Sequence, residues 1–179
     1  MEDLQKKLQE TKDWLQKEYA GIRTGQASPA LLDNIKIDNY GAKSPINQVG
    51  TVGIEDARTL RVSVWDNAMI GAIETAVADA DLGVSVATDS AGLRIVFPEL
   101  TAERREQLLK LAKSKLEDAR IAVRAARDEA MKSLEKQEKS GELSKDELFG
   151  EKETVQTGVE KINKELEELF SVKEKELHK

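Results

Sequence analysis

Five basic side chains in the second half of the chain have the types and spacing needed to bind phosphate groups. They follow one another at intervals of 3, 7, 4 and 3 residues: Lys110, Lys113, Arg120, Arg124 and Arg127. At about 100° per residue, these positions fall within an arc of roughly 60–100° on one side of a helix. Because the planar guanidinium of arginine can hold a phosphate through two hydrogen bonds, the spacing predicts a phosphate-binding surface, here called the basic stripe. The alternative is a solvated helix face with local ion pairs such as Glu117–Arg120 and Arg124–Asp128.

Groups suited to other chemistry are scarce. The single histidine, His178, is next to the C-terminus, and the chain has no cysteine, so neither general acid–base catalysis nor a Cys/His zinc site is expected. The segment Gly50-Thr51-Val52-Gly53 lacks the lysine of a phosphate-binding loop, and adjacent carboxylates such as Glu167 and Glu168 are typical of a solvated helix surface. We therefore predict no enzyme activity, no catalytic residue, no metal site, no cofactor and no small-molecule substrate.

The composition favours long, solvated helices over a bulky core. Charged residues make up 35% of the 179 residues and aromatic residues only 4%. The net charge of −6 is unevenly distributed, because residues 30–100 carry −5 whereas residues 101–140 carry +3. This local basic region predicts an anionic partner. Without aromatic side chains interleaved among the cations, the backbone of folded RNA fits better than a stacked single strand.

Neither a membrane partner nor export is expected. No stretch approaches the ~18–20 apolar residues of a membrane span, and the acidic start Met1-Glu2-Asp3-Leu4 does not resemble a signal peptide. We therefore expect a cytoplasmic location.

Helical periodicity predicts helices over residues 2–24, 102–139 and from 145 to the C-terminus. Apolar residues recur every three or four positions: Leu4, Leu8, Leu15 and Ile22 with Trp14 and Tyr19 beside them; Leu108, Ala112, Leu116, Ala119, Val123, Ala126, Ala130 and Leu134; and Leu148, Val155, Val159, Ile162, Leu166 and Leu169. Thr101 is a predicted N-cap, and Ser144 with Glu147 forms a predicted capping box. The short connection Ser140–Leu143 predicts antiparallel neighbours, and the three segments close most simply into one elongated bundle.

The middle of the chain alternates with the period of strands. Strands are predicted at 58–65, around 84–86, at 93–97 and around 35–37, with a hairpin turn at 89–92 and a short helix from Asp66 to about residue 79. The predicted fold class is therefore α+β: an antiparallel three-helix bundle (1–29 plus 102–179) with an inserted, strand-rich α/β domain (30–101).

Two crossings between these domains, near 25–30 and 98–103, predict a hinge. The predicted hinge residues are Thr24, Gly25, Gln26, Ala27, Ser28, Pro29, Pro98, Leu100 and Thr101.

Motifs in order along nearly the whole chain resemble those of ribosome recycling factors. Residues 21–32 resemble the family's R-T-G-R-A-S/T-P signature, and residues 40–49 its Y-Y-G segment with P-L-x-Q. Residues 57–66 resemble A-R-T-L followed by W/Y-D, residues 100–105 resemble L-T-x-E-R-R, and residues 117–124 resemble E-x-A-R/K-V-A/S-V/I-R. Two departures weaken the basic character of the pattern: Gln26 and Asp128 stand where the family usually has arginine.

The resemblance implies an L-shaped translation factor that binds the large ribosomal subunit through ribosomal RNA after termination. With elongation factor G, which hydrolyses GTP, it would split the subunits and release mRNA and tRNA. It also implies that a monomer acts and that Arg23 joins the basic stripe in contacting RNA. Two alternatives remain open: a coiled-coil protein that pairs its apolar seams with other helices, and an enzyme site within residues 30–100.

Overall fold

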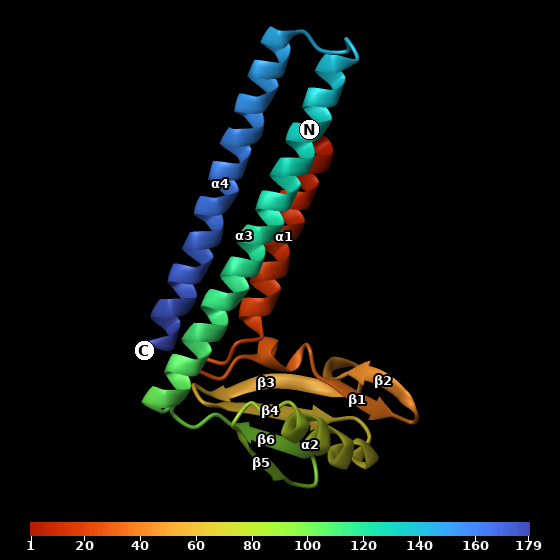
Figure 1. Cartoon of the computed structure of the whole chain (residues 1–179). Coiled ribbons are helices and arrows are strands. Elements are labelled where there is room, and N and C mark those ends of the chain that lie inside the picture. The colour runs from red at the N-terminus through yellow and green to blue at the C-terminus, as the bar shows by residue number, and fades with distance from the viewer. The chain divides into compact units, whose positions relative to one another are not determined.

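The computed structural model describes residues 1–179 and has the predicted α+β class, with four α-helices and six strands (Figure 1). The helices are α1 (Glu2–Ala20), α2 (Ile70–Asp79), α3 (Ala102–Lys139) and α4 (Lys145–Leu177), and the strands are β1 (Lys36–Asn39), β2 (Ala42–Pro45), β3 (Gly50–Asp56), β4 (Thr59–Val64), β5 (Ser85–Thr88) and β6 (Gly92–Val96). Contacts divide the chain into two compact units. The bundle unit comprises Met1–Tyr19 and Leu109–Lys175, and the sheet unit comprises Ala20–Leu108 and Glu176–Lys179.

Ion pairs between the helices show how the bundle unit is assembled. Lys7 of α1 pairs with Glu129 of α3, and Glu18 of α1 pairs with Lys115 of α3. Residue numbers rise along α1 as they fall along α3, so these two helices are antiparallel. Across α3 and α4 the pairs are Arg120–Glu167 and Glu135–Lys152, again antiparallel. Lys12 of α1 pairs with Glu165 of α4 at 3.0 Å. All three helices therefore contact one another and form the predicted bundle.

The predicted seams form the core of the bundle unit, with differences near the ends. Leu4, Leu8, Leu15 and Tyr19 of α1 are buried, as is most of the α3 and α4 seams. Ala130, Leu148 and Leu169 are only partly buried. Trp14 is 37% exposed. The Lys115 ammonium lies 5.8 Å from the centroid of the Trp14 ring. This cation–π contact stabilises an indole at the surface.

The predicted caps are present at both long helices. Thr101 Oγ1 accepts the Arg104 N–H at 3.1 Å. At the start of α4, Ser144 Oγ accepts the Glu147 N–H at 3.1 Å while a Glu147 carboxylate oxygen accepts the Ser144 N–H at 2.7 Å. These bonds satisfy amide groups that have no partner within the helix. The Ser144 amide, followed by its hydroxyl, holds the pKa of Glu147 below its usual range.

We expect Ser144→Ala to destabilise the bundle unit by about 1 kcal/mol, because it leaves the Glu147 amide without its cap. Urea unfolding followed by circular dichroism measures this loss. Thr157→Ala, well inside α4, is the matched control and should cost less. Equal stability of Ser144→Ala and the unaltered protein would show that the reciprocal cap adds nothing.

The sheet unit contains two antiparallel sheets. Strands β1 and β2 form a hairpin, and the larger sheet has the order β3-β4-β6-β5. Val62 of β4 is opposite Leu93 of β6, and Leu60 is opposite Ile95. These four side chains point to one face and are fully buried together with Ile73 and Val77 of α2. The alternation predicted for these strands is therefore the core face of the sheet.

Turn and cap chemistry in the sheet unit also follows the prediction. Asp89 N–H bonds the Gly92 carbonyl at 2.9 Å, closing the predicted 89–92 turn between β5 and β6. Gly92 has φ 156°, and a side chain there would collide with the Val62 carbonyl. Asp66 accepts the Ala68 N–H at 3.0 Å and caps a short 3-10 turn that leads into α2.

Two expectations about the elements are wrong. Helix α1 ends at Ala20 rather than near residue 24, because Ile22 and Arg23 leave the helix and are buried in the sheet unit. Strands β2 and β3 were not expected: β2 has the sequence Ala-Lys-Ser-Pro, and β3 alternates weakly around two glycines. Both gain their regular structure from a neighbouring strand rather than from local pattern.

The solvent-facing side of the larger sheet carries two bidentate ion pairs. Arg61 binds both carboxylate oxygens of Asp89, at 2.6 and 2.8 Å, and Arg94 binds Glu55 in the same bidentate way. The Arg61 bond, followed by the amides of Ala91 and Gly92, holds the pKa of Asp89 well below its usual range. A carboxyl whose pKa is lowered by folding stabilises the folded state above its ordinary pKa.

We therefore expect the sheet unit to lose stability as the pH falls below about 4, where an aspartate of the unfolded chain is about half protonated. Asp89→Asn should reduce this dependence, because asparagine keeps the turn acceptor but does not titrate. Urea unfolding at pH 7 and at pH 3 gives the comparison, with the exposed Asp79→Asn as control. An equal drop in stability for Asp89→Asn and the unaltered protein would assign the acid sensitivity to other groups.

Candidate functional site: a basic stripe on a long helix

The five residues of the predicted basic stripe all belong to α3 and to the bundle unit. The helix is continuous for 38 residues, so its regular geometry keeps the stripe on one side, as the spacing predicts. The neighbouring seam residues Ala112, Leu116, Ala119 and Val123 are buried. Packing of the seam therefore fixes the rotation of α3 and holds the stripe at the surface.

Three members of the stripe, Lys110, Lys113 and Arg124, are exposed. No carboxylate lies within ion-pair distance of their charged groups. Unpaired lysine and arginine side chains on a rigid helix are ready to exchange counterions for phosphate groups. These three residues are the part of the stripe that is free to bind an anion.

The other two members are already paired. Arg120 Nη2 donates to Glu167 Oε1 of α4 at 2.7 Å, and Arg127 donates from Nε and Nη2 to Asp128 Oδ1 at 3.3 and 3.2 Å. The local pairs Glu117–Arg120 and Arg124–Asp128 considered above do not form. Arg120 is paired across helices, which the spacing within one helix does not show, whereas Arg127 is paired with its sequence neighbour on the same helix.

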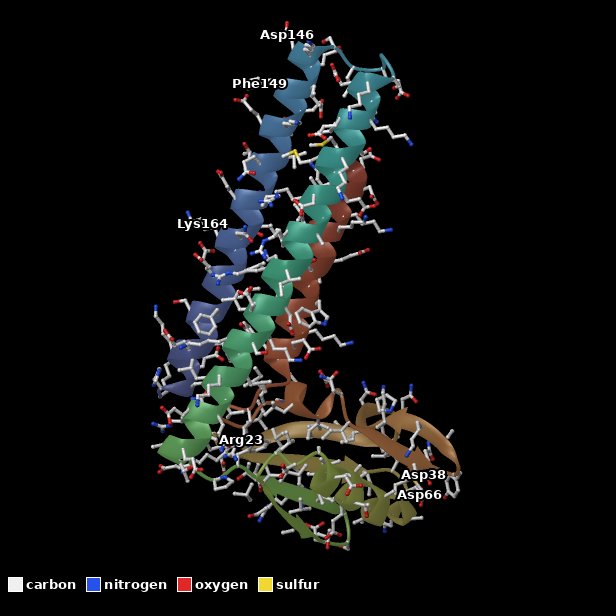
Figure 2. All side chains as sticks on the ribbon, viewed as in Figure 1. Arg23, Asp38, Asp66, Asp146, Phe149 and Lys164 are labelled. Carbon is white, nitrogen blue, oxygen red and sulfur yellow. The ribbon has the colours of Figure 1, made fainter.

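The expectation that Arg23 contacts RNA does not fit its environment. Arg23 lies in the sheet unit (Figure 2) and is only 6% exposed. Its guanidinium donates to the carbonyls of Leu82 and Gly83, both at 3.1 Å, and to the Pro98 carbonyl. The guanidinium also lies 5.6 Å from the centroid of the Phe97 ring. Burial, followed by the nearby charge of Arg104, lowers the pKa of Arg23.

These contacts make Arg23 a structural residue that joins the chain after α1 to the loops after α2 and β6. A positively charged group can occupy this buried position because carbonyl oxygens accept hydrogen bonds from both Nη atoms, although Nε is buried without a partner. One signal in the sequence points to this role: Ile22 and Arg23 lie three and two residues before Gly25, at the end of the apolar pattern. That signal did not identify the buried partners, which are about 60 to 75 residues away.

The predicted hinge residues lie in the sheet unit and differ in their surroundings. Gln26 is exposed, and the Ala27 N–H bonds the Ala57 carbonyl at 2.8 Å. Leu100 is buried, whereas Pro98 and Thr101 are exposed. The remaining hinge residues, Thr24, Gly25, Ser28 and Pro29, are half-buried.

No group of three or more histidine, cysteine, aspartate or glutamate side chains is placed to hold a metal ion. A depression in the sheet unit is lined by Lys36, Asp38, Lys43 and Asp79 among small and apolar residues. Thr75 also lines it, but no hydrogen bond or ion pair joins a hydroxyl or lysine of this depression to one of its carboxylates, so the enzyme alternative gains no support there.

The apolar seams of α3 and α4 are largely used within the bundle. The large apolar residues that remain exposed in the bundle unit are Met1, Trp14, Leu111, Ile121, Phe149 and Val172. They are spread over three helices rather than forming a seam, so the coiled-coil alternative also gains no support.

No helix is both long and apolar enough to cross a membrane.

Comparisons with known proteins agree with the motif resemblance. A family model described as ribosome recycling factor matches residues 15–177. Ribosome-recycling factors of Xanthobacter autotrophicus and Bartonella quintana are 42% and 41% identical to this chain, each over 99% of the chain and 95% of the relative.

Two solved structures are also similar over nearly the whole chain. A solution structure of the ribosome recycling factor has a TM-score of 0.79 and 33% identity, covering 99% of this chain and 94% of that one. The second presents models for the Thermus thermophilus ribosome recycling factor and the Escherichia coli elongation factor G bound to the E. coli post-termination complex. It has a TM-score of 0.67 and 36% identity, covering 98% of this chain and 95% of that one.

Proposed function

The chain belongs to the ribosome recycling factor family, and we propose from this that it binds the post-termination ribosome and, with elongation factor G, separates the subunits. Separation releases mRNA and tRNA for another round of translation. A family relative has been placed on a post-termination complex together with elongation factor G. That relative supports both partners proposed here, the ribosome and the elongation factor.

The observation that carries the proposal in this chain is the exposed cationic part of the basic stripe. Lys110, Lys113 and Arg124 lie on one side of a rigid helix and have no carboxylate partner. Ribosomal RNA presents phosphate groups along its folded backbone, and such contacts fix position without reading sequence. The bundle unit is therefore proposed as the arm that docks on the large subunit through ribosomal RNA.

The sheet unit has a different role in this proposal. Residues 30–100 carry a net charge of −5, against +3 for residues 101–140, so RNA repels residues 30–100 while it attracts the stripe. We propose that the chain near residues 25–30 and 98–103 acts as a hinge, with 1–29 plus 102–179 and 30–101 as its two domains. Force from elongation factor G then moves the domains relative to each other and breaks contacts between the ribosomal subunits.

No bond-making step is assigned to this chain. The free energy for subunit separation comes from GTP hydrolysis on elongation factor G in this proposal, so the factor contributes binding and motion alone. It acts as a monomer in the cytoplasm, where its ribosomal partner works.

Co-sedimentation with purified large ribosomal subunits across a salt series tests this function. If three to four phosphate groups are neutralised, the logarithm of the association constant should fall against the logarithm of salt concentration with a slope of about −3 to −4. Saturable binding with this slope supports both docking and the stripe. If the protein is folded and monomeric but does not bind at low salt, the proposal is refuted, and the coiled-coil alternative becomes the better explanation.

A further inference from the structure

We propose that two carboxylates of this chain, Glu167 and Asp128, compete with RNA phosphate groups for Arg120 and Arg127 and so limit its affinity for the large subunit. The inference rests on the proposed docking function and identifies residues that tune it. The two arginines at issue are the paired members of the stripe. Every other cation of the stripe is unpaired, so the competition is confined to two positions.

Glu167 reaches Arg120 from the neighbouring helix. The two side chains are 62% and 37% exposed, with Nη2 and Oε1 2.7 Å apart. An ion pair this exposed is weak in water, since both charges remain solvated. An incoming phosphate can therefore displace the Glu167 carboxylate, which then turns away into solvent about its flexible side chain. Glu167 should lower the affinity, but only modestly.

Asp128 restrains Arg127 in a different way. The two residues are adjacent in sequence, so the carboxylate cannot leave the neighbourhood of the guanidinium even when the hydrogen bonds break. A phosphate bound at Arg127 would have this negative charge within a few ångströms of it, at a separation where salt screens little. Asp128 should therefore weaken phosphate binding at Arg127 more strongly than Glu167 does at Arg120.

Asp128 also differs from the family pattern described above, which usually has a second arginine directly after the position of Arg127. A basic residue there would extend the stripe, whereas aspartate neutralises its end. The consequence is a division of the stripe into an active part, Lys110, Lys113 and Arg124, and an internally compensated part. Removing the charge of Arg127 should then cost less affinity than removing that of Arg124.

The experiment measures binding of the full chain to purified large ribosomal subunits in about 0.1 M salt. We expect Asp128→Asn to bind about threefold to tenfold more tightly and Glu167→Gln about twofold to threefold more tightly. Matched controls remove the same charge elsewhere. Glu168→Gln is next to Glu167, and Asp118→Asn is on α3, nine residues before Arg127 and hence on the opposite side of the helix. Both controls should change affinity less than twofold.

A double-mutant cycle separates competition from a general gain of positive charge. Arg127→Gln should cost little in the unaltered protein and several-fold more affinity in the Asp128→Asn background. Equal costs in both backgrounds would overturn the inference for Asp128, and unchanged affinity of Glu167→Gln would overturn it for Glu167. If the unaltered protein itself failed to bind, the docking function would fail instead, so the two failures are distinguishable.

Discussion

Arg124→Glu is expected to weaken binding to the large ribosomal subunit by about 100-fold or more at physiological salt. The change removes an exposed, unpaired cation from the stripe and places an anion opposite the RNA backbone. Both effects oppose phosphate contact, and repulsion between like charges at an interface costs several kcal/mol. Co-sedimentation or fluorescence anisotropy across a salt series measures the loss, and the salt dependence should become shallower as well.

The fold of this variant should be unaffected, because arginine and glutamate have similar helix propensities and Arg124 makes no ion pair. Helicity by circular dichroism and the urea midpoint check this point. Lys136→Glu is the matched control. It makes the same charge change on the same helix about 120° around the axis from Arg124, so it should reduce affinity far less. Equal affinities of Arg124→Glu and the unaltered protein would remove the stripe from the docking surface.

Arg23→Ala is expected to destabilise the sheet unit by about 3 kcal/mol. Three carbonyl groups, those of Leu82, Gly83 and Pro98, would lose their donor, and the packing of the guanidinium against Phe97 would disappear. A buried acceptor left without a partner costs about 1–3 kcal/mol. Urea unfolding at pH 7 measures the change, which should shift the midpoint with little effect on the slope.

The same variant distinguishes a structural arginine from an RNA-binding one. If Arg23 only supports the fold, Arg23→Ala should leave the salt dependence of large-subunit binding unchanged under conditions in which the variant remains folded. Arg23→Lys should recover part of the stability, because a lysine ammonium can reach some of the same carbonyls. Normal stability combined with a salt slope about one unit shallower would restore Arg23 to the RNA-binding surface.

The comparison between Arg23 and Arg124 shows where residue type alone misleads. Both are arginines in segments that match family motifs, and both were expected to contact RNA. Arg124 is on a helix whose seam faces inward, so the periodicity of its neighbours already indicates exposure. Arg23 follows the end of a helix, where periodicity no longer indicates orientation, and its partners come from two distant loops. Only the folded chain could show that it is buried.

The bounds of α3 and α4 and their caps were predictable from the chain because the interactions that determine them are local. The Ser144–Glu147 cap joins residues three positions apart, and the apolar seams repeat every three or four residues. The 89–92 turn was equally predictable, since Asp89 bonds within the turn itself. Local sequence therefore determined the two long helices, the main hairpin, the predicted fold class and the positions of the stripe on α3.

Tertiary structure decided the features that depend on residues far apart in the chain. Strand β3 needs β4 as its hydrogen-bonding neighbour, and α1 ends at Ala20 because the following residues pack into the sheet unit. Arg120 is paired because a neighbouring helix brings Glu167, 47 residues away, to 2.7 Å. Charge compensation depends on distance in space, which spacing along one helix does not contain. The fold therefore decides that Arg120 is compensated, whereas Arg127 is compensated by its sequence neighbour Asp128.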